Sequence, residues 1–137
     1  MYSFNVESAP VPKARARATI RNGKIWHYTP KATADFEQIV RLTAIKAGVK
    51  PIEGPVGMAI VFQFKKQEVK PGEWHTRKPD LTNLAKSVED ALNGVAYKDD
   101  SQIVELLVEK EFGKKNVVFV QIWEKKDRKD LINRINY

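Results

Sequence analysis

The residues best suited to chemistry lie in one stretch, from Asp80 to Asp100. Asp80 precedes an amphipathic run, while Asp99 and Asp100 open a β-like segment further along. Acids gathered from separate elements suit Mg²⁺, which takes few protein carboxylates and keeps positions for water and phosphate oxygens. Such a metal neutralises a phosphodiester and helps to generate hydroxide. The stretch therefore predicts metal-assisted hydrolysis of a phosphodiester.

The residues after Asp80 predict a helix over residues 80–93 with an apolar and a polar face. At about 100° per residue, its apolar side chains fall within one arc of roughly 120° that faces the core. Asn83, Lys86 and Asp90 follow an i, i+3, i+7 pattern and lie on a separate polar arc with Ser87. Asp80 is expected to cap the helix with its carboxylate. The expected core residues are Leu81, Leu84, Ala85, Val88, Ala91 and Leu92.

Each of these residues also has a structural interpretation. Asp80 could be only a helix cap, and Asp99 with Asp100 could be only a turn before a strand. Lys86 and Asp90 could be an exposed ion pair worth a few tenths of a kcal/mol. Neighbouring strand residues point to opposite sides, so one of the two adjacent aspartates faces the site and the other lies behind it or in solvent. The gathering of acids at element ends in a basic chain favours chemistry.

Composition limits the kinds of site that are possible. The chain has 137 residues, no cysteine and two histidines, His27 and His75, which excludes a disulfide framework and a thiolate or His-rich metal site. Any metal must be held mainly by oxygen, as Mg²⁺ or Mn²⁺ would be. The formal net charge of +7 favours nucleic acid as a partner, although it also serves solubility. No leader pattern or membrane-length apolar run is visible, so the cytoplasm is the expected compartment.

The N-terminal half predicts strands, a hairpin and a helix. Residues 2–7 alternate as a strand does, and Asn22-Gly23 between residues 17–21 and 24–28 is a strong hairpin signal. Thr29 is expected to cap a helix that has Pro30 in its first position and ends at Gly48. Its apolar positions at helical spacing are Phe36, Ile39, Val40, Thr43, Ala44 and Ala47.

The C-terminal half predicts three more strands. Residues 56–64 form a buried strand, and the polar residues 65–77 form a loop. Residues 103–112 and 117–123 are two strands separated by a short link, and we expect them to pair as an antiparallel hairpin. Residues 126–137 predict a short basic helix. The order of elements indicates a single small α+β domain over residues 1–137, with a mixed or antiparallel sheet and two main helices.

Several basic and aromatic residues are candidate DNA contacts. Lys13, Arg15 and Arg17 alternate with small residues and would project to one side of an extended segment, although a solvated loop explains them equally well. Trp26 and Tyr28 could stack on unpaired bases, with at least one expected in the core. The bases around the loop before Asp80 are Lys65, Lys66, Lys70, Arg77 and Lys78. In that loop Trp74 is a wedge or an anchor, and His75 is expected to be inert. Weaker candidates are Lys125, Lys126, Arg128 and Lys129.

Three spaced blocks resemble the RusA family of Holliday-junction resolvases, the crossover junction endodeoxyribonucleases of bacteria and their phages. The blocks are Lys78-Pro79-Asp80-x-x-Asn83-Leu84-x-Lys86, Asp90-Ala91-Leu92-Asn93-Gly94 and Asp99-Asp100-x-Gln102-Ile103. Likeness in the N-terminal half rests on Pro12-Lys13-x-Arg15-x-Arg17 and Tyr28-Thr29-Pro30. The resemblance implies a RusA-like fold and a homodimer that uses Mg²⁺, or Mn²⁺, to cut four-way DNA junctions by symmetric paired nicks.

By position, the resemblance implies that Asp80 and Asp100 bind the metal and that Lys86 acts near the scissile phosphate. Asp99 and Asp90 are neighbouring acids, Asp99 with a catalytic and metal-binding role and Asp90 with a metal-binding one. Asn83 joins the candidate DNA contacts. The family usually has an acid where this chain has Thr82, so the site has one negative charge fewer. Three interpretations are open: Asp99 or Asp90 compensates for the missing charge, Thr82 holds a metal-bound water, or the chain binds junctions without cutting them. We expect that the activity is retained.

Overall fold

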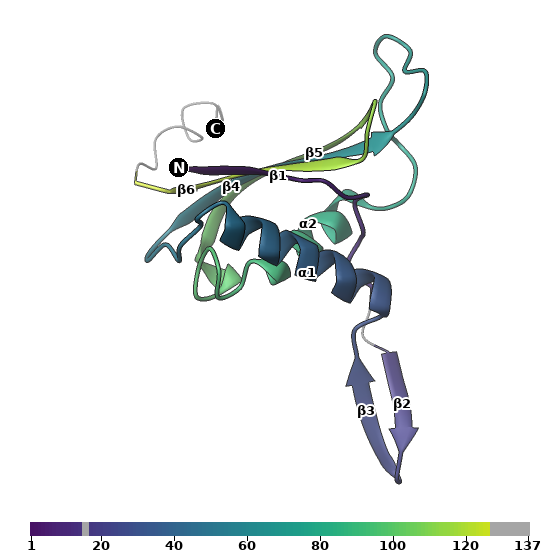
Figure 1. Cartoon of the computed structure of the whole chain (residues 1–137), viewed down its shortest axis with the longest axis vertical. Coiled ribbons are helices and arrows are strands. Elements are labelled where there is room, and N and C mark those ends of the chain that lie inside the picture. Colours follow the sequence, from purple (N-terminus) through teal and green to yellow (C-terminus); the bar gives the residue numbers. More distant parts are fainter. Residues whose placement is uncertain (15–16, 127–137) are drawn as a thin grey trace, which may run out of the picture.

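A four-stranded sheet with the order β1-β6-β4-β5 forms the centre of the structure, a computed structural model that describes residues 1–14 and 17–126. Its strands are β1 (Tyr2–Val6), β4 (Val56–Lys65), β5 (Ile103–Gly113) and β6 (Val117–Glu124). Helices α1 (Lys31–Lys46) and α2 (Leu81–Ala91) both lie against one face of this sheet (Figure 1). The predicted α+β class, mixed sheet and two main helices are confirmed. No helix in the described residues is long and apolar enough to cross a membrane.

Strand β4 is central, because it pairs in parallel with β5 and antiparallel with β6. A continuous apolar run suits a strand that is hydrogen-bonded on both edges and covered by helices. The buried side chains of β4 that face the helices are Val56, Met58, Ile60 and Phe62. Those of the helices are Phe36, Val40 and Ala44 from α1 and Leu84, Val88 and Ala91 from α2. This packing fixes α2, which carries most of the predicted site.

The predicted hairpin between β5 and β6 is wrong, because β4 lies between these two strands. The short link at residues 114–116 passes over the end of β4 and is hydrogen-bonded to it. Gln63 Nε2 donates to the Lys115 carbonyl at 2.9 Å, and Lys65 N donates to Asn116 Oδ1 at 2.8 Å. These bonds hold the link against the end of β4.

Several predicted details at the helices are corrected. Helix α1 has Pro30 rather than Thr29 as its N-cap, whereas its predicted end at Gly48 is confirmed, since Gly48 has a φ of 84° and directly follows the C-cap Ala47. Ile39, predicted on the core side of α1, is 41% exposed. Asp80 is the N-cap of α2 as predicted, but its side chain makes no capping hydrogen bond. The Asp80 carboxylate is therefore free for other partners.

Strands β2 (Arg17–Arg21) and β3 (Lys24–Tyr28) form a separate hairpin that projects away from the domain (Figure 1). Asn22 and Gly23 make its turn, with φ angles of 52° and 76° that match the predicted turn. Trp26 and Tyr28 are 54% and 47% exposed, so the expectation that one of them packs in the core is wrong. The predicted C-terminal helix, apart from its first residue, lies outside the described residues.

Candidate active site

The polar face of α2 holds Lys86 between two carboxylates from different elements. Lys86 Nζ lies 3.1 Å from Asp90 Oδ1, one helical turn later, and 3.3 Å from Asp100 Oδ2. Asp100 begins η1 (Asp100–Gln102), a 3₁₀ turn before β5. The hydrogen bond to Asp90 raises the pKa of Lys86, burial opposes this, and Asp100 adds to it. Lys86 is therefore a charged, half-exposed ammonium held in a defined position.

Asp90 is also bound by Lys13, which joins the N-terminal segment to both helices. Lys13 Nζ lies 3.2 Å from Asp90 Oδ2 and 2.6 Å from Glu37 Oε1 on α1. Burial lowers the pKa of Lys13, but its bonds to Glu37 and Asp90 outweigh burial and raise it. Glu37, Lys13, Asp90, Lys86 and Asp100 therefore form one alternating chain of charges. Both oxygens of Asp90 are occupied by ammonium groups.

The segment that carries Lys13 is clamped between the helices by two buried hydroxyls. Ser87 Oγ of α2 lies 2.8 Å from the Val11 carbonyl and 2.7 Å from the Leu84 carbonyl, either of which can accept its single proton. Thr33 Oγ1 of α1 donates to the Pro12 carbonyl at 3.1 Å. Ser87 was predicted on the polar face of the helix, but it is fully buried. Its role is to fix the segment from which Lys13 reaches the charge cluster.

Asp99 and Asp100 have different surroundings as predicted, but the strand geometry expected for them is wrong, because Asp99 is the N-cap and Asp100 the first residue of a 3₁₀ turn before β5. The Asp99 carboxylate accepts a hydrogen bond from Ser101 N at 3.1 Å, and this bond lowers the pKa of Asp99. The Gln102 side chain accepts from Asp99 N at 3.1 Å and donates to the Ile52 carbonyl at 2.8 Å. Asp99 thus caps the turn, and Gln102 ties the turn to the loop before β4. Asp100 contacts Lys86 instead.

Asp80 lies at the start of α2, and its Oδ1 is 3.1 Å from Lys78 Nζ. This pair is weak, because the two side chains are 86% and 52% exposed. Lys110 of β5 fixes the preceding loop by donating to the carbonyls of Arg77 at 2.6 Å and Pro79 at 2.8 Å. Thr82 is exposed on the first turn of α2. Asp80 and Thr82 are therefore presented to solvent on a rigid element.

The described contacts unite Lys86, Asp90 and Asp100 but leave Asp80 paired with Lys78 alone. Within residues 1–14 and 17–126, no three Asp, Glu or His side chains gather closely enough to share a metal ion. Asp80 and Asp100 do present carboxylate oxygens that no backbone amide occupies, and Mg²⁺ needs only one or two such ligands. Asp80 and Asp100 therefore have the donor chemistry for a mostly hydrated Mg²⁺, although none of the described contacts joins the two side chains. Asp99 and Asp90 are less suited to bind Mg²⁺. The backbone of the turn uses the Asp99 carboxylate, and two lysines use both oxygens of Asp90.

The loop before Asp80 encloses a basic and aromatic pocket of about 480 Å³. His75 is buried there, stacked on Phe112 with ring centroids 4.4 Å apart and edge-on to Phe64 at 4.6 Å. Burial, with the charge of Lys110, lowers the pKa of His75 and keeps it neutral. Trp74 is 67% exposed. His75 therefore anchors the loop, while Trp74 remains at its surface.

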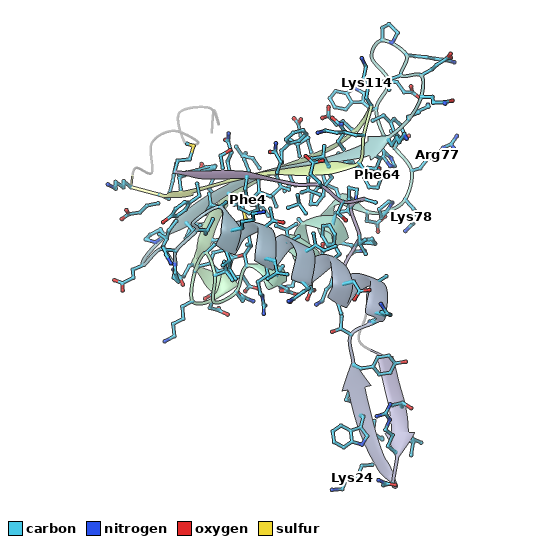
Figure 2. The ribbon with its side chains drawn as sticks, in the orientation of Figure 1. Phe4, Lys24, Phe64, Arg77, Lys78 and Lys114 are labelled. Atoms are coloured by element: carbon cyan, nitrogen blue, oxygen red, sulfur yellow. The ribbon has the colours of Figure 1, made fainter. Side chains whose placement is uncertain are left out.

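The predicted DNA contacts divide by whether their charge is used inside the protein. Lys13 and Lys66 are engaged, Lys13 as described and Lys66 by Glu73. Arg77 and Lys78 point away from the body (Figure 2), and Lys78 is also in its exposed pair with Asp80. Lys65, Lys70 and Asn83 are exposed, whereas Lys125 is paired with Glu105 at 3.2 Å. Arg15, the Arg17 side chain, Arg128 and Lys129 lie outside the described residues.

Two acids near the cluster were missed in the sequence. Glu37 is one, and it follows the buried Phe36 on α1 with no periodic signal of its own. Glu89 is the other, and burial raises its pKa, opposed by Lys86. The hydroxyl of the fully buried Tyr97 donates to the Glu89 carbonyl at 2.7 Å. Glu37 joins the cluster only through the packing of α1 beside the N-terminal segment, which local sequence does not reveal, whereas Glu89 lies on α2 three residues after Lys86.

Comparisons with known proteins identify the family of this chain. A family model described as Endodeoxyribonuclease RusA matches residues 7–123, which include every element of the charge cluster. The uncharacterized protein YqaN of Bacillus subtilis (strain 168) is 37% identical over 134 residues, covering 88% of this chain and 94% of YqaN. The crossover junction endodeoxyribonuclease rusA of Lactococcus phage r1t is 27% identical over 128 residues, covering 90% of this chain and 96% of the phage protein.

Proposed function

Because this chain belongs to the RusA endodeoxyribonuclease family, we propose that it resolves four-way (Holliday) DNA junctions as a magnesium-dependent, structure-selective endonuclease. The supporting observation is Lys86, a charged side chain held between Asp90 and Asp100 within the matched residues. A homodimer would make the two symmetric nicks, because a two-fold junction suits a two-fold protein. The setting is DNA recombination and repair in a bacterium or phage.

In this proposal the residues of the cluster have distinct roles. Asp80 and Asp100 hold the metal, which supplies a Lewis acid for the scissile phosphate when bound. Lys86 donates to a phosphate oxygen and stabilises the negative charge of the transition state. The oxygen of a water forms a bond to phosphorus as the bond to the 3′ oxygen breaks. The leaving oxygen takes a proton, which leaves 5′-phosphate and 3′-hydroxyl ends.

Asp90 and Asp99 are positioning residues in this scheme. Asp90 holds Lys86 from the same helix and keeps it in place when Asp100 turns to another partner. Asp99 caps the turn that presents Asp100. Contacts to branched DNA around Asp80 come from Arg77, Lys78, Lys65 and Asn83. The cations among them offset the repulsion between the acids of the site and the DNA phosphates.

A second candidate function is junction binding without cutting, and Thr82 is the observation that favours it. A hydroxyl is a neutral and weaker oxygen ligand than a carboxylate. The exposed Thr82 lies two residues after Asp80, where the family usually has an acid. With only Asp80 and Asp100 to hold the metal, cutting depends on higher metal concentrations than a three-acid site requires.

The test uses a labelled synthetic four-way junction with Mg²⁺, Mn²⁺ or chelator. Wild type, Asp100→Asn and Thr82→Asp are compared, with linear duplex as the control substrate. Symmetric metal-dependent nicks that Asp100→Asn abolishes support the resolvase. Tight junction binding without nicks, converted to nicking by Thr82→Asp, supports the binding protein. A wild type that neither binds nor cuts junctions excludes both.

A further inference from the structure

The net positive charge is concentrated in one segment of the chain. Residues 8–34 contain six Lys and Arg and no Asp or Glu, so they carry six of the seven net positive charges. Within this segment Lys13 is used by Glu37 and Asp90, and Lys31 is paired with Asp35 at 2.6 Å. The hairpin of β2 and β3 holds the next cations, Arg21 and Lys24, which have no carboxylate on their own element to neutralise them.

The hairpin packs on nothing else in the described part of the chain. Every residue of β3 is exposed, including Ile25 at 67% and Trp26 at 54%. Figure 2 shows Lys24 at the tip of the hairpin, far from the labelled Phe4 of the core. An isolated two-stranded hairpin is only marginally stable in water. An element of this kind with large exposed side chains is suited to bind a partner.

The two faces of the hairpin differ in chemistry. Cross-strand pairing places Thr19 opposite Trp26 and Arg21 opposite Lys24, so these four share one face with Tyr28. Two shallow depressions of about 270 and 280 Å³ lie along this face, and Arg21 and Trp26 line both. The opposite face consists of Ala18, Ile20, Ile25 and His27. Only the first face combines cations with aromatic rings.

We propose that the β2–β3 hairpin is a DNA-binding arm that grips the sugar-phosphate backbone with Arg21 and Lys24 and stacks Trp26 and Tyr28 on exposed bases. The proposal rests on the proposed function, since the ligand is the DNA substrate. Cations neutralise phosphates and release counterions, whereas aromatic rings stack on bases of any sequence. The positive charge of the segment makes DNA a better match for it than an apolar protein would be.

The base of the arm is fixed beside the candidate site. The segment before β2 is clamped between α1 and α2 by Thr33 and Ser87, and its Lys13 binds Asp90. Pro30, just after β3, caps α1. The hairpin is thus connected to segments that pack against α2, the helix that carries Lys86. DNA bound along the hairpin would therefore stay close to the candidate active site.

The test measures junction and duplex binding by fluorescence anisotropy over a range of salt, with Ca²⁺ in place of Mg²⁺. The Arg21→Ala/Lys24→Ala variant should lower the slope of log affinity against log salt by about two, because each lost phosphate contact removes roughly 0.9. Trp26→Ala should weaken binding roughly tenfold with the slope unchanged. Two controls are Lys46→Ala/Lys50→Ala, which removes the same charge from outside the arm, and Ile25→Thr on the opposite face. Both should bind like wild type.

The outcomes separate this inference from the proposed function. Unchanged slope and affinity in the arm variants overturn it, as do equal losses in the Lys46→Ala/Lys50→Ala control. Weaker self-association in Ile25→Thr, with DNA binding intact in the arm variants, assigns the hairpin to a second copy of the chain instead. Junction binding by the wild type in Ca²⁺, together with no nicks in Mg²⁺ or Mn²⁺, sinks only the catalytic proposal. Because the arm packs on nothing else, its variants should unfold thermally like wild type.

Discussion

Asp90 and Asp100 both contact Lys86, but they differ in their other partners. Asp90 has both oxygens on ammonium groups, while Asp100 has one contact and lies at the start of a turn. A carboxylate neutralised by two lysines is poorly suited to a metal and well suited to hold a cation. The two acids therefore have different roles: Asp90 positions Lys86, whereas Asp100 can accept a new ligand.

Asp90→Asn should lower the rate of junction nicking by up to about 100-fold, because a misplaced catalytic group costs this much. The bond from Asp90 raises the pKa of Lys86, so its loss should lower that pKa and move the alkaline limb of the rate profile to lower pH. Single-turnover rates against pH measure both effects. Asp35→Asn, which breaks the exposed pair with Lys31, is the matched control. An unmoved alkaline limb in Asp90→Asn would contradict the role.

Thr82→Asp should reduce the Mg²⁺ concentration needed for half-maximal nicking severalfold, because it adds a carboxylate two residues after Asp80. Thr82→Asn, which has a similar side chain without the charge, should leave that concentration unchanged. The measurement is the nicking rate as a function of Mg²⁺ for the three proteins. The same metal requirement in all three would mean that position 82 does not face the metal.

At the scale of elements, the outer face of β4 limits what position 57 can hold. A Cβ on Gly57 would lie 2.3 Å from the Trp123 ring of β6. Gly57→Ala should therefore lower the free energy of unfolding by roughly 1–3 kcal/mol, as overpacking does. Urea denaturation measures the loss. Combining Gly57→Ala with Trp123→Leu should restore part of it, and no restoration would point to a cause other than this contact.

The loop that leads to Asp80 should loosen in acid, because its anchor is a buried neutral histidine. The pKa of His75 lies below its ordinary value of 6.5, so protons bind the unfolded loop more readily than the folded one. The stability of the loop is thus fully present above about pH 6.5 and falls as the pH drops through the lower folded pKa. Amide exchange of residues 66–78 measures it. His75→Phe should remove the dependence, and the exposed His27→Gln should preserve it.

The elements that could be predicted from the sequence rest on local signals. The errors concern which strands pair with each other and which distant side chains meet. Helical spacing predicted that Lys86 and Asp90 meet, and Asn22-Gly23 predicted its turn. The short link after β5 also looked like a hairpin turn, but β4 is apolar on both faces and needs the centre of the sheet. The contact of Lys13 with Glu37 depends on how α1 packs beside α2. No local pattern in either segment specifies such a contact.

For the whole molecule, the property to measure is the oligomeric state. We expect sedimentation to give twice the 15.7 kDa mass of one chain, and one dimer bound to each four-way junction. The two active sites of such a dimer would face strands of like polarity, which explains paired nicks. A single chain bound per junction would contradict the dimer, while leaving single-strand nicking possible.

The pairing of β1 with β6 has a consequence for biosynthesis. Val6 pairs with Val118, so β1 leaves the ribosome long before β6, the strand it pairs with in the described part of the chain, exists. At roughly 5–20 residues per second, the wait lasts roughly 6–22 s. During translation β1 has an apolar face and no strand to pair with, and an unpaired apolar strand is prone to aggregate until its partner is made. The sheet can close only when nearly the whole chain has been made.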